Sequence, residues 1–314
     1  MIGPGDRRNV LWLILAAACW GIGTVISKQA VAEMPPLTLL PIQLATSVGF
    51  LLVLTRVRGE RMPTGREGRL LGRLGLLNPG LAYALSLVGL TQISASLAVL
   101  LWASEPIFIL GLAALVLGER VGLPIIASSA VAILGLVLVV FDPAASGSSV
   151  GIALTVAGVV VCAIYTVATR RWLLGSDSTF SVVLAQQVHA LALAVGVVIA
   201  LAATGQQMAP RTLTLGGLAS AAASGLLYYA FAYSFYVTAL RSVRASIAAA
   251  SFYLIPVFGL AGGWLVGERL EPVQWLGGIV VIAAVAIITT RIARPAAAAP
   301  ARPVETLGSV ESTT

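Results

Sequence analysis

Charged side chains are scarce in this sequence. Only 10% of its 314 residues are charged, 59% are apolar, and the mean hydropathy is +0.99. A water-soluble domain carries charge on about a quarter of its residues, so the composition excludes a soluble globule. Apolar runs recur instead, each close to the roughly 20 residues that a helix needs to cross a bilayer core of about 30 Å. The composition predicts an all-α integral membrane protein.

Side chains typical of metal and redox sites are also rare. The two cysteines, Cys19 and Cys162, both lie inside apolar runs, which argues against a disulfide framework. His189 is the only histidine, so histidines cannot together hold a metal ion. The sequence lacks the phosphate-cradling G-x-x-x-x-G-K-S/T loop that a primary pump would need, and it lacks the clustered acids, histidines or activated nucleophile of an enzyme. We therefore expect no catalytic site and no cofactor.

Most basic residues lie in the loops that flank the apolar runs. The formal charge of +7 does not predict nucleic-acid binding, because the arginines fall in loops and form no basic face. The first run follows Arg7-Arg8 as in a signal peptide, but without a clear small-residue cleavage site, so we interpret it as a retained helix. With ten spans and a cytoplasmic N-terminus, 16 of the 19 basic residues lie inside, and only Lys28, Arg211 and Arg269 lie outside. The positive-inside rule then predicts that both termini are cytoplasmic.

Ten transmembrane helices are predicted from the apolar runs. The predicted spans are Val10–Val31, Leu37–Thr55, Leu71–Leu90, Ser94–Leu117, Leu123–Phe141, Gly151–Arg170, Phe180–Thr204, Leu215–Leu240, Ala245–Val266 and Pro272–Thr290. Arg56–Arg73 is the one strongly charged loop between them. The resulting domains are a cytoplasmic N-terminus (1–9), a first five-helix repeat (10–141), a linker (142–150), a second five-helix repeat (151–290) and a disordered cytoplasmic tail (291–314).

The two repeats are visible as sequence echoes. Ser96–Arg120 matches Ser246–Arg269, with a proline at corresponding places and Gly-Glu-Arg at the end of both. An internal duplication of this kind has to be recognised before a fold is proposed. Because each half holds five spans, an odd number, the second half enters the membrane upside down. Inverted repeats are a recurring plan of secondary transporters, with the substrate near the midplane between the halves.

These halves resemble the EamA family of the drug/metabolite transporter superfamily. The resemblance rests on the Trp20-Gly21 start, on the fourth helix with Pro106 and a Gly-Glu-Arg end, and on their copies in the second half. It implies a ten-helix carrier of the inner cell membrane that moves amino acids, related metabolites or drugs, often outward. It implies a central cavity lined mainly by the first, third, fourth, sixth, eighth and ninth helices, with the fifth and tenth peripheral. Since one chain holds both halves, we expect it to work as a monomer.

Two alternatives to metabolite export remain open. A flippase for lipids or lipid-linked sugars is one, because the superfamily includes such activities. Drug efflux is the other. The small multidrug resistance relatives carry an acid in the first helix that binds a proton and a cationic drug, but the matching run around Trp20 has no acid. Proton-coupled efflux of lipophilic cations by that mechanism is therefore in doubt.

Glu105 is the sharpest site candidate, because an acid near mid-span costs about 2.5 kcal/mol or more on insertion scales. We expect it about a dozen residues into its helix, beside Pro106. It is interpreted as a proton site, with protons as the coupling ion, or as the counter-charge of a substrate amine. The alternative is a protonated, structural glutamate. Trp102, three residues earlier, would share its face and stack on a flat substrate or simply pack.

The tyrosines of the eighth span form a second candidate. Tyr229, Tyr233 and Tyr236 follow an i, i+4, i+7 pattern and share one face, while Tyr228 is expected to point to the side. Tyr83 is the repeat mate of Tyr233, so the two are expected to face each other across the pseudo-twofold axis. Their rings would suit aromatic or cationic groups, or they would pack with bonded hydroxyls.

The remaining polar residues within spans have a structural and a functional interpretation each. Asn78 would bind substrate or cap carbonyls freed by the neighbouring proline, His189 would relay protons or be a hydrogen-bonded structural residue, and the Gly-Glu-Arg ends would be helix caps or an inter-half latch. Lys28 and Arg170 would snorkel or hold a substrate carboxylate. The candidates for substrate binding or translocation are Glu105, Trp102, Tyr83, Tyr233, Tyr229, Asn78, Gln43, Gln187, His189, Trp20 and Tyr165.

Overall fold

The structure, a computed structural model, describes residues 4–90, 92–93, 98, 101–119, 121–140, 148–173, 178–210, 212–267 and 271–292. Its elements are helices. Six helical segments are long and apolar enough to cross a membrane, and three shorter apolar helices accompany them within these ranges. The uninterrupted long helices are α1 (Pro4–Glu33), α2 (Pro36–Val57), α8 (Ser149–Trp172) and α9 (Thr179–Ala203).

The third helical segment of each half is interrupted at the same place. In the first half α3 (Gly65–Arg73), η1 (Leu74–Leu76) and η2 (Leu77–Leu81) lead into α4 (Ala82–Leu90). In the second half α10 (Leu215–Gly225) and η4 (Leu226–Phe231) lead into α11 (Ala232–Leu240). Both η2 and η4 are π-helical turns, which are frequent at functional sites. The structure corrects one prediction, because α3 occupies the end of the segment 56–73 that was expected to be a loop.

The fourth segment of each half is broken as well. α12 (Ala245–Ala250) and η5 (Ser251–Tyr253) precede α13 (Leu254–Leu265) in the second half. In the first half a turn at Ala103–Ser104 precedes α6 (Glu105–Leu117). Glu105 was expected about a dozen residues into its helix. It is instead the first residue of α6. The cause is Pro106, which lacks an N–H and fits the first helical turn, where that donor has no partner anyway.

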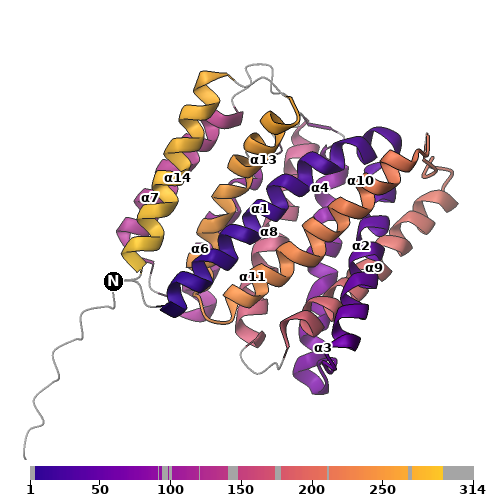
Figure 1. Ribbon diagram of the computed structural model, residues 1–314, viewed down its shortest axis with the longest axis horizontal. Helices are drawn as coiled ribbons and strands as arrows, with labels where there is room; N and C mark the ends of the chain where they lie inside the picture. The colour runs from indigo at the N-terminus through magenta and orange to yellow at the C-terminus, as the bar shows by residue number, and fades with distance from the viewer. Residues whose placement is uncertain are drawn as a thin grey trace, which may run out of the picture.

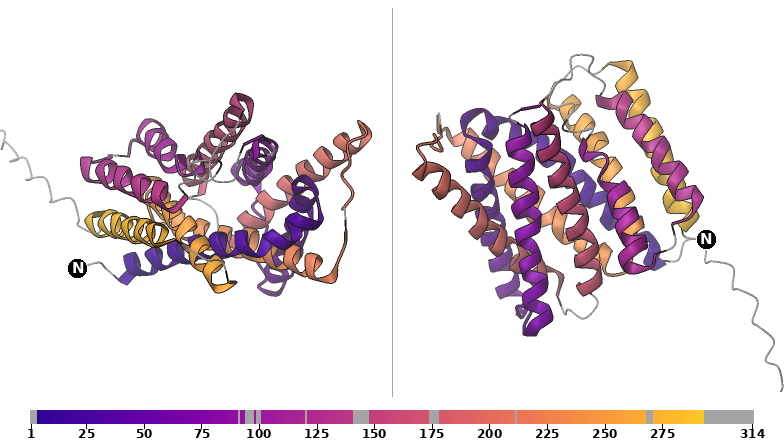
Figure 2. Two further views of the ribbon diagram at one scale, coloured as in Figure 1. Left: turned by 90° about the horizontal axis from the view of Figure 1, so that it is seen from above. Right: turned by 180° about the vertical axis from the view of Figure 1, so that it is seen from behind.

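The helices of the two halves exchange partners reciprocally. α1 packs against α13 while α8 packs against α6, and α1 contacts α10 and α11 while α8 contacts α4. α2 packs against α9, its counterpart, and α7 (Leu123–Val140) packs against α14 (Pro272–Ile292) at one edge of the bundle (Figures 1 and 2). Reciprocal contacts of this kind are what a two-fold relation between halves produces.

Glycines allow the closest approaches between the halves. A Cβ on Gly135 of α7 would lie 2.9 Å from the carbonyl oxygen of Gly277, and a Cβ on Gly277 of α14 would lie 2.6 Å from that of Gly135. At repeat-related places, a Cβ on Gly75 would collide with the backbone of Gln186, and one on Gly225 would lie 2.6 Å from the carbonyl oxygen of Gln43. Small residues that bring backbones together are typical of helix packing in membranes.

Polar contacts join loops at both ends of the bundle. The start of α9 marks one end, where Ser178 and Ser181 bond Glu60. Further bonds at that end run from Arg241 Nε to Thr179 (2.9 Å), from Arg170 Nη1 to the Arg241 carbonyl (2.9 Å) and from the Ala245 amide to Glu119 (2.8 Å). The opposite end carries bonds from Thr214 to Glu33 (2.6 Å), from Thr38 to the Met208 carbonyl (2.6 Å) and from Ser148 to the Gln92 carbonyl (3.0 Å).

The outer faces of the bundle expose large apolar side chains. Leu134, Ile199 and Ile279 are 65%, 63% and 63% exposed, although all three lie well inside their helices. Large apolar patches on a protein in water mark a surface that something covers. On a bundle of helices this long and apolar, the cover is lipid.

Glu119 of the first Gly-Glu-Arg sequence joins the halves. Gly118 ends α6 in the left-handed conformation at φ 65°, as the helix-cap interpretation predicts. The Glu119 carboxylate then accepts bonds from the amides of Ala245 and Ser246, at 2.8 and 3.0 Å, and from the Ser246 hydroxyl at 2.5 Å. It thereby caps the N-terminus of α12 in the other half, which favours the latch interpretation. Arg120, Glu268 and Arg269 lie outside the described residues.

Candidate functional site

A chain of buried polar side chains links the two halves. The Glu105 carboxyl group meets the thiol of Cys162 on α8. The amide nitrogen of Asn78 donates to the Cys162 sulfur at 3.1 Å, and the Tyr233 hydroxyl donates to the Asn78 amide oxygen at 3.0 Å. Asn78 lies in the interrupted segment of the first half, with extended backbone angles of φ −145° and ψ 125°. This break turns its side chain towards α8 and α11 and not along its own helix.

Aromatic rings surround the polar chain. The ring centroid of Tyr229 lies 6.0 Å from that of Tyr83 and 6.1 Å from that of Tyr233. Trp20 of α1 meets Tyr233 edge-on at 5.5 Å, and the Tyr165 ring of α8 lies 6.3 Å from that of Tyr233. Tyr83 was expected to face Tyr233 across the pseudo-twofold axis, and this stays a prediction; the Tyr229 ring contacts both of theirs.

Several buried polar atoms in this cluster have no hydrogen-bond partner. They include one carboxyl oxygen of Glu105, the indole nitrogen of Trp20 and the hydroxyl groups of Tyr236 and Thr166, of which the last two lie against each other. Trp20 and Tyr236 are in ring contact, with centroids 5.6 Å apart. A buried polar group without a partner costs about 1–3 kcal/mol, so such atoms usually serve a ligand or an ordered water. Their grouping makes this cluster between the halves the candidate site for a polar ligand.

The sequence matches one protein family along almost its whole length. The model of the EamA-like transporter family aligns with residues 7–141 and again with residues 149–290. The chain belongs to this family. It is thus a multi-pass membrane transporter with two related halves. Members of this family are generally transporters, not enzymes.

Solved structures agree on the fold of this EamA-like chain. One crystal structure aligns with 91% of it and with 99% of its own chain, at a TM-score of 0.75 and 17% sequence identity. At that identity the likeness concerns the fold alone. No curated protein matches the sequence.

Two members of the cluster were missed by reading the sequence. Tyr228 was expected to point aside, yet its hydroxyl accepts a bond from the Tyr83 hydroxyl at 3.0 Å. Cys162 was taken as one residue of an apolar run, yet it lies between Glu105 and Asn78. The repeat contains the signal for both, because Cys162 is aligned with Trp20, and Tyr228 stands as far before Tyr233 as Asn78 stands before Tyr83.

Trp102 lies beside the cluster without sharing a helix with Glu105. The turn at Ala103–Ser104 separates them, so the predicted common helix face does not form. The Trp102 ring packs against Tyr83 instead, with centroids 5.7 Å apart. Trp102 therefore belongs to the aromatic wall.

The other predicted polar residues tie helices together. Gln43 donates to Ser27 and Ser224 at 3.1 and 2.8 Å, and Gln187 bonds Ser47 and donates to the Tyr229 carbonyl at 2.7 Å. His189 Nδ1 lies 2.7 Å from the carbonyl oxygen of Ala185, one turn back in its own helix. The bond of His189 is the one that its structural interpretation expects, the two glutamines join neighbouring helices, and the polar cluster remains the candidate substrate site.

Proposed function

We propose that this EamA-like protein is a secondary transporter that exports amino acids or related small metabolites across the inner cell membrane by alternating access. The carrying observation is the cluster at the interface of two halves that match the family separately and exchange partners reciprocally. A carrier needs a polar site between halves that can rearrange, and the paired halves supply two related arrangements.

The proposal includes ten spans, inverted repeats at 10–141 and 151–290, and cytoplasmic termini. Contacts at the two ends of the bundle support this topology. Arg58, Arg170 and Arg241, all assigned to the cytoplasmic side, lie at the end where α9 begins. Glu33 and Thr214, assigned to the outer side, bond each other at the opposite end.

Glu105 is proposed as the group that meets the amino end of the substrate. Its unpartnered carboxyl oxygen can accept a charge-assisted bond from an ammonium group. The rings of Trp20, Tyr83 and Tyr233 border the same space and attract cations through their faces. The position of Glu105 at the first residue of α6 also explains why an acid is tolerated here, because the helix N-terminus stabilises negative charge.

Metabolite measurements test the proposal. We would quantify metabolites inside cells and in the medium, with wild type, Glu105→Gln or Glu67→Gln at matched membrane levels. Glu67 is exposed on α3, so the last variant controls for the loss of a carboxylate. Wild type and Glu67→Gln are expected to move a small set of amino compounds outward, and Glu105→Gln is expected to lose at least about tenfold of that export, the loss of one charged hydrogen bond.

Other outcomes have distinct meanings. Equal export by wild type and Glu105→Gln would make Glu105 a structural residue. If no soluble compound moves, while a lipid-linked compound changes leaflet, the flippase alternative replaces the exporter. Export that depends on an imposed proton gradient in wild type would identify protons as the coupling ion.

A further inference from the structure

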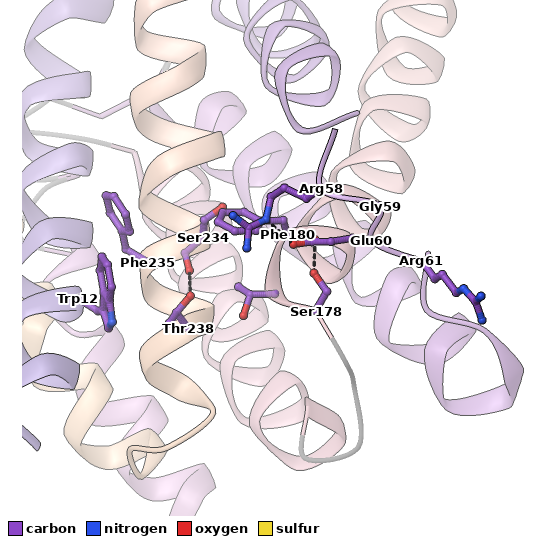
Figure 3. A pocket seen from close by; sticks show the side chains of 11 residues that line it. Trp12, Arg58, Gly59, Glu60, Arg61, Ser178, Phe180, Ser234, Phe235 and Thr238 are labelled. Atoms are coloured by element: carbon purple, nitrogen blue, oxygen red, sulfur yellow. Dashed lines mark hydrogen bonds and ion pairs between the residues drawn. The ribbon is translucent and has the colours of Figure 1, made fainter. Parts of the chain in front are cut away.

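A pocket of about 710 Å³ opens at the end of the bundle where α9 begins (Figure 3). Metabolite sites typically occupy about 300–1,000 Å³. The pocket lies between α1 and α2 of the first half and α9 and α11 of the second, outside the polar cluster. Its apolar walls are the rings of Trp12, Phe180 and Phe235.

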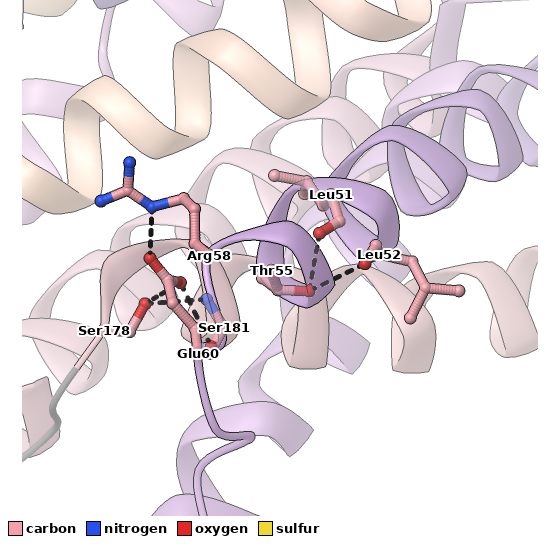
Figure 4. A network of polar contacts seen from close by, with 7 residues as sticks. All are labelled: Leu51, Leu52, Thr55, Arg58, Glu60, Ser178 and Ser181. Atoms are coloured by element: carbon pink, nitrogen blue, oxygen red, sulfur yellow. Dashed lines mark hydrogen bonds and ion pairs between the residues drawn. The ribbon is translucent and has the colours of Figure 1, made fainter.

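Arg58 is held with its cationic end available. Its Nε donates to Glu60 at 2.8 Å (Figure 4). Its guanidinium carbon lies 5.3 Å from the centre of the Phe180 ring. Glu60 in turn is fixed by Ser178 and Ser181. The two terminal nitrogens of Arg58 have no hydrogen-bond partner among the described residues. They form the planar donor fork that matches a carboxylate.

Ser234 supplies a second open group. It is only 3% exposed, it lines the pocket, and its hydroxyl has no hydrogen-bond partner. The other hydroxyls of the pocket lining are engaged: Thr238 bonds the Ser234 carbonyl at 2.6 Å, Thr179 accepts from Arg241 and Ser178 bonds Glu60. A buried hydroxyl without a hydrogen-bond partner lowers stability, and a ligand that bonds it removes this cost. Ser234 is therefore a candidate ligand contact next to Arg58.

The balance of charge selects the ligand. Arg58 and Arg61 line the pocket against the single carboxylate of Glu60, which is already bonded on both oxygens. Arg61 points away from the other labelled side chains in Figure 3. One available guanidinium with one hydroxyl suits a singly charged carboxylate better than a phosphate dianion, and the aromatic walls suit an apolar or aromatic side group.

We infer that this pocket is an entry site for a carboxylate-bearing metabolite with an apolar or aromatic side group, held by Arg58 and Ser234. The inference deepens the proposed function, since it identifies the acidic end of the exported molecule. On this basis the pocket first receives the molecule by its carboxylate near the cytoplasmic end. The cluster around Glu105 then receives the amino group, after the molecule has moved deeper into the bundle.

Binding of three related probes to the purified full-length protein tests the inference. They are 3-phenylpropionate, which has only the carboxylate, L-phenylalaninamide, which has only the amino group, and L-phenylalanine, which has both. Calorimetry is expected to show phenylpropionate binding to wild type with a dissociation constant raised about tenfold or more by Arg58→Gln and roughly fivefold by Ser234→Ala. Arg69→Gln, at an exposed arginine of α3 outside the pocket lining, is the matched control, expected to change it less than about twofold.

Two features guard against misfolding. Ser234→Ala removes an unpaired hydroxyl, so its melting temperature should equal or exceed that of wild type while binding weakens. Arg58→Lys keeps the charge and the contact with Glu60 but loses the fork, so it should bind with intermediate affinity.

The inference is overturned if phenylpropionate fails to bind wild type, if Arg58→Gln or Ser234→Ala binds it as wild type does, or if only a short-chain phosphatidylglycerol binds through Arg58. Phenylalaninamide separates this inference from the proposed function. Its binding should depend on Glu105 and not on Arg58. If Glu105→Gln leaves its binding unchanged, the Glu105 site of the proposed function is contradicted, whereas the pocket at Arg58 is judged by phenylpropionate alone.

Discussion

Two tyrosines one turn apart on α11 differ in what their hydroxyl groups meet. Tyr233 and Tyr236 are 2% and 1% exposed. The Tyr233 hydroxyl bonds Asn78 at 3.0 Å, whereas the Tyr236 hydroxyl has no hydrogen-bond partner. At the scale of single residues, the bundle thus holds both satisfied and unsatisfied polar atoms within one cluster. The first kind fixes the structure, and the second kind leaves hydrogen-bonding capacity unused.

Replacing each tyrosine by phenylalanine separates these roles. Tyr233→Phe leaves the Asn78 oxygen unpaired and should lower the free energy of unfolding by about 1–3 kcal/mol. Tyr236→Phe removes a hydroxyl that lies against Thr166 without forming a hydrogen bond of good geometry. It should change stability by less than about 0.5 kcal/mol, while it reduces export. Melting temperatures in detergent together with the export assay measure both effects. A larger loss of stability for Tyr236→Phe would contradict the assignment.

At the scale of helices, the contact between α7 and α14 depends on two glycines. The resemblance to the family implied that these helices are peripheral, and they pack against each other at the edge of the bundle (Figure 1). Gly135 and Gly277 face each other's backbone there. Backbones this close leave no room for a methyl group on either side.

Gly277→Ala should therefore force α7 and α14 apart. Its Cβ would lie 2.6 Å from the Gly135 carbonyl oxygen and 2.8 Å from the Val139 amide nitrogen, and overpacking of this kind costs about 1–3 kcal/mol. Gly111→Ala on α6 is the matched control, because its Cβ would meet nothing within 4 Å. It should stabilise the protein by up to about 1 kcal/mol through the unfolded chain. Thermal denaturation in detergent would refute the prediction if both variants melt alike.

At the scale of the molecule, the question is which end of the bundle faces the cytoplasm. Arg61 and Gln206 are both exposed, close to the start and the end of α9. A helix of 25 residues is about 37 Å long, enough to cross a bilayer core of about 30 Å, so the two positions should lie on opposite sides.

Single-cysteine variants test this orientation. In intact cells a membrane-impermeant maleimide should label Gln206→Cys but not Arg61→Cys, and opening the cells should make both reactive. Cys19 and Cys162 are free, so both would first be replaced by alanine. Labelling of Arg61→Cys in intact cells would reverse the orientation, and labelling of both would argue against a span between them.

The sequence by itself determined the membrane class, the duplication and the family. Composition fixes the solvent, since so few charges cannot cover a soluble surface. The paired Gly-Glu-Arg ends and prolines identify the halves, because related sequences fold alike. The family match at 7–141 and 149–290 confirms the resemblance.

Only the tertiary structure decided which polar residues meet. Asn78 reaches Cys162 because its segment breaks, and Glu105 begins a helix because Pro106 interrupts one. Hydrophobic periodicity does not register such breaks, since most residues around them are apolar on every side of the helix. The same holds for the pocket at Arg58 and Ser234, which combines four helices from both halves. Contacts between distant segments depend on how the helices pack, and packing is a property of the whole bundle.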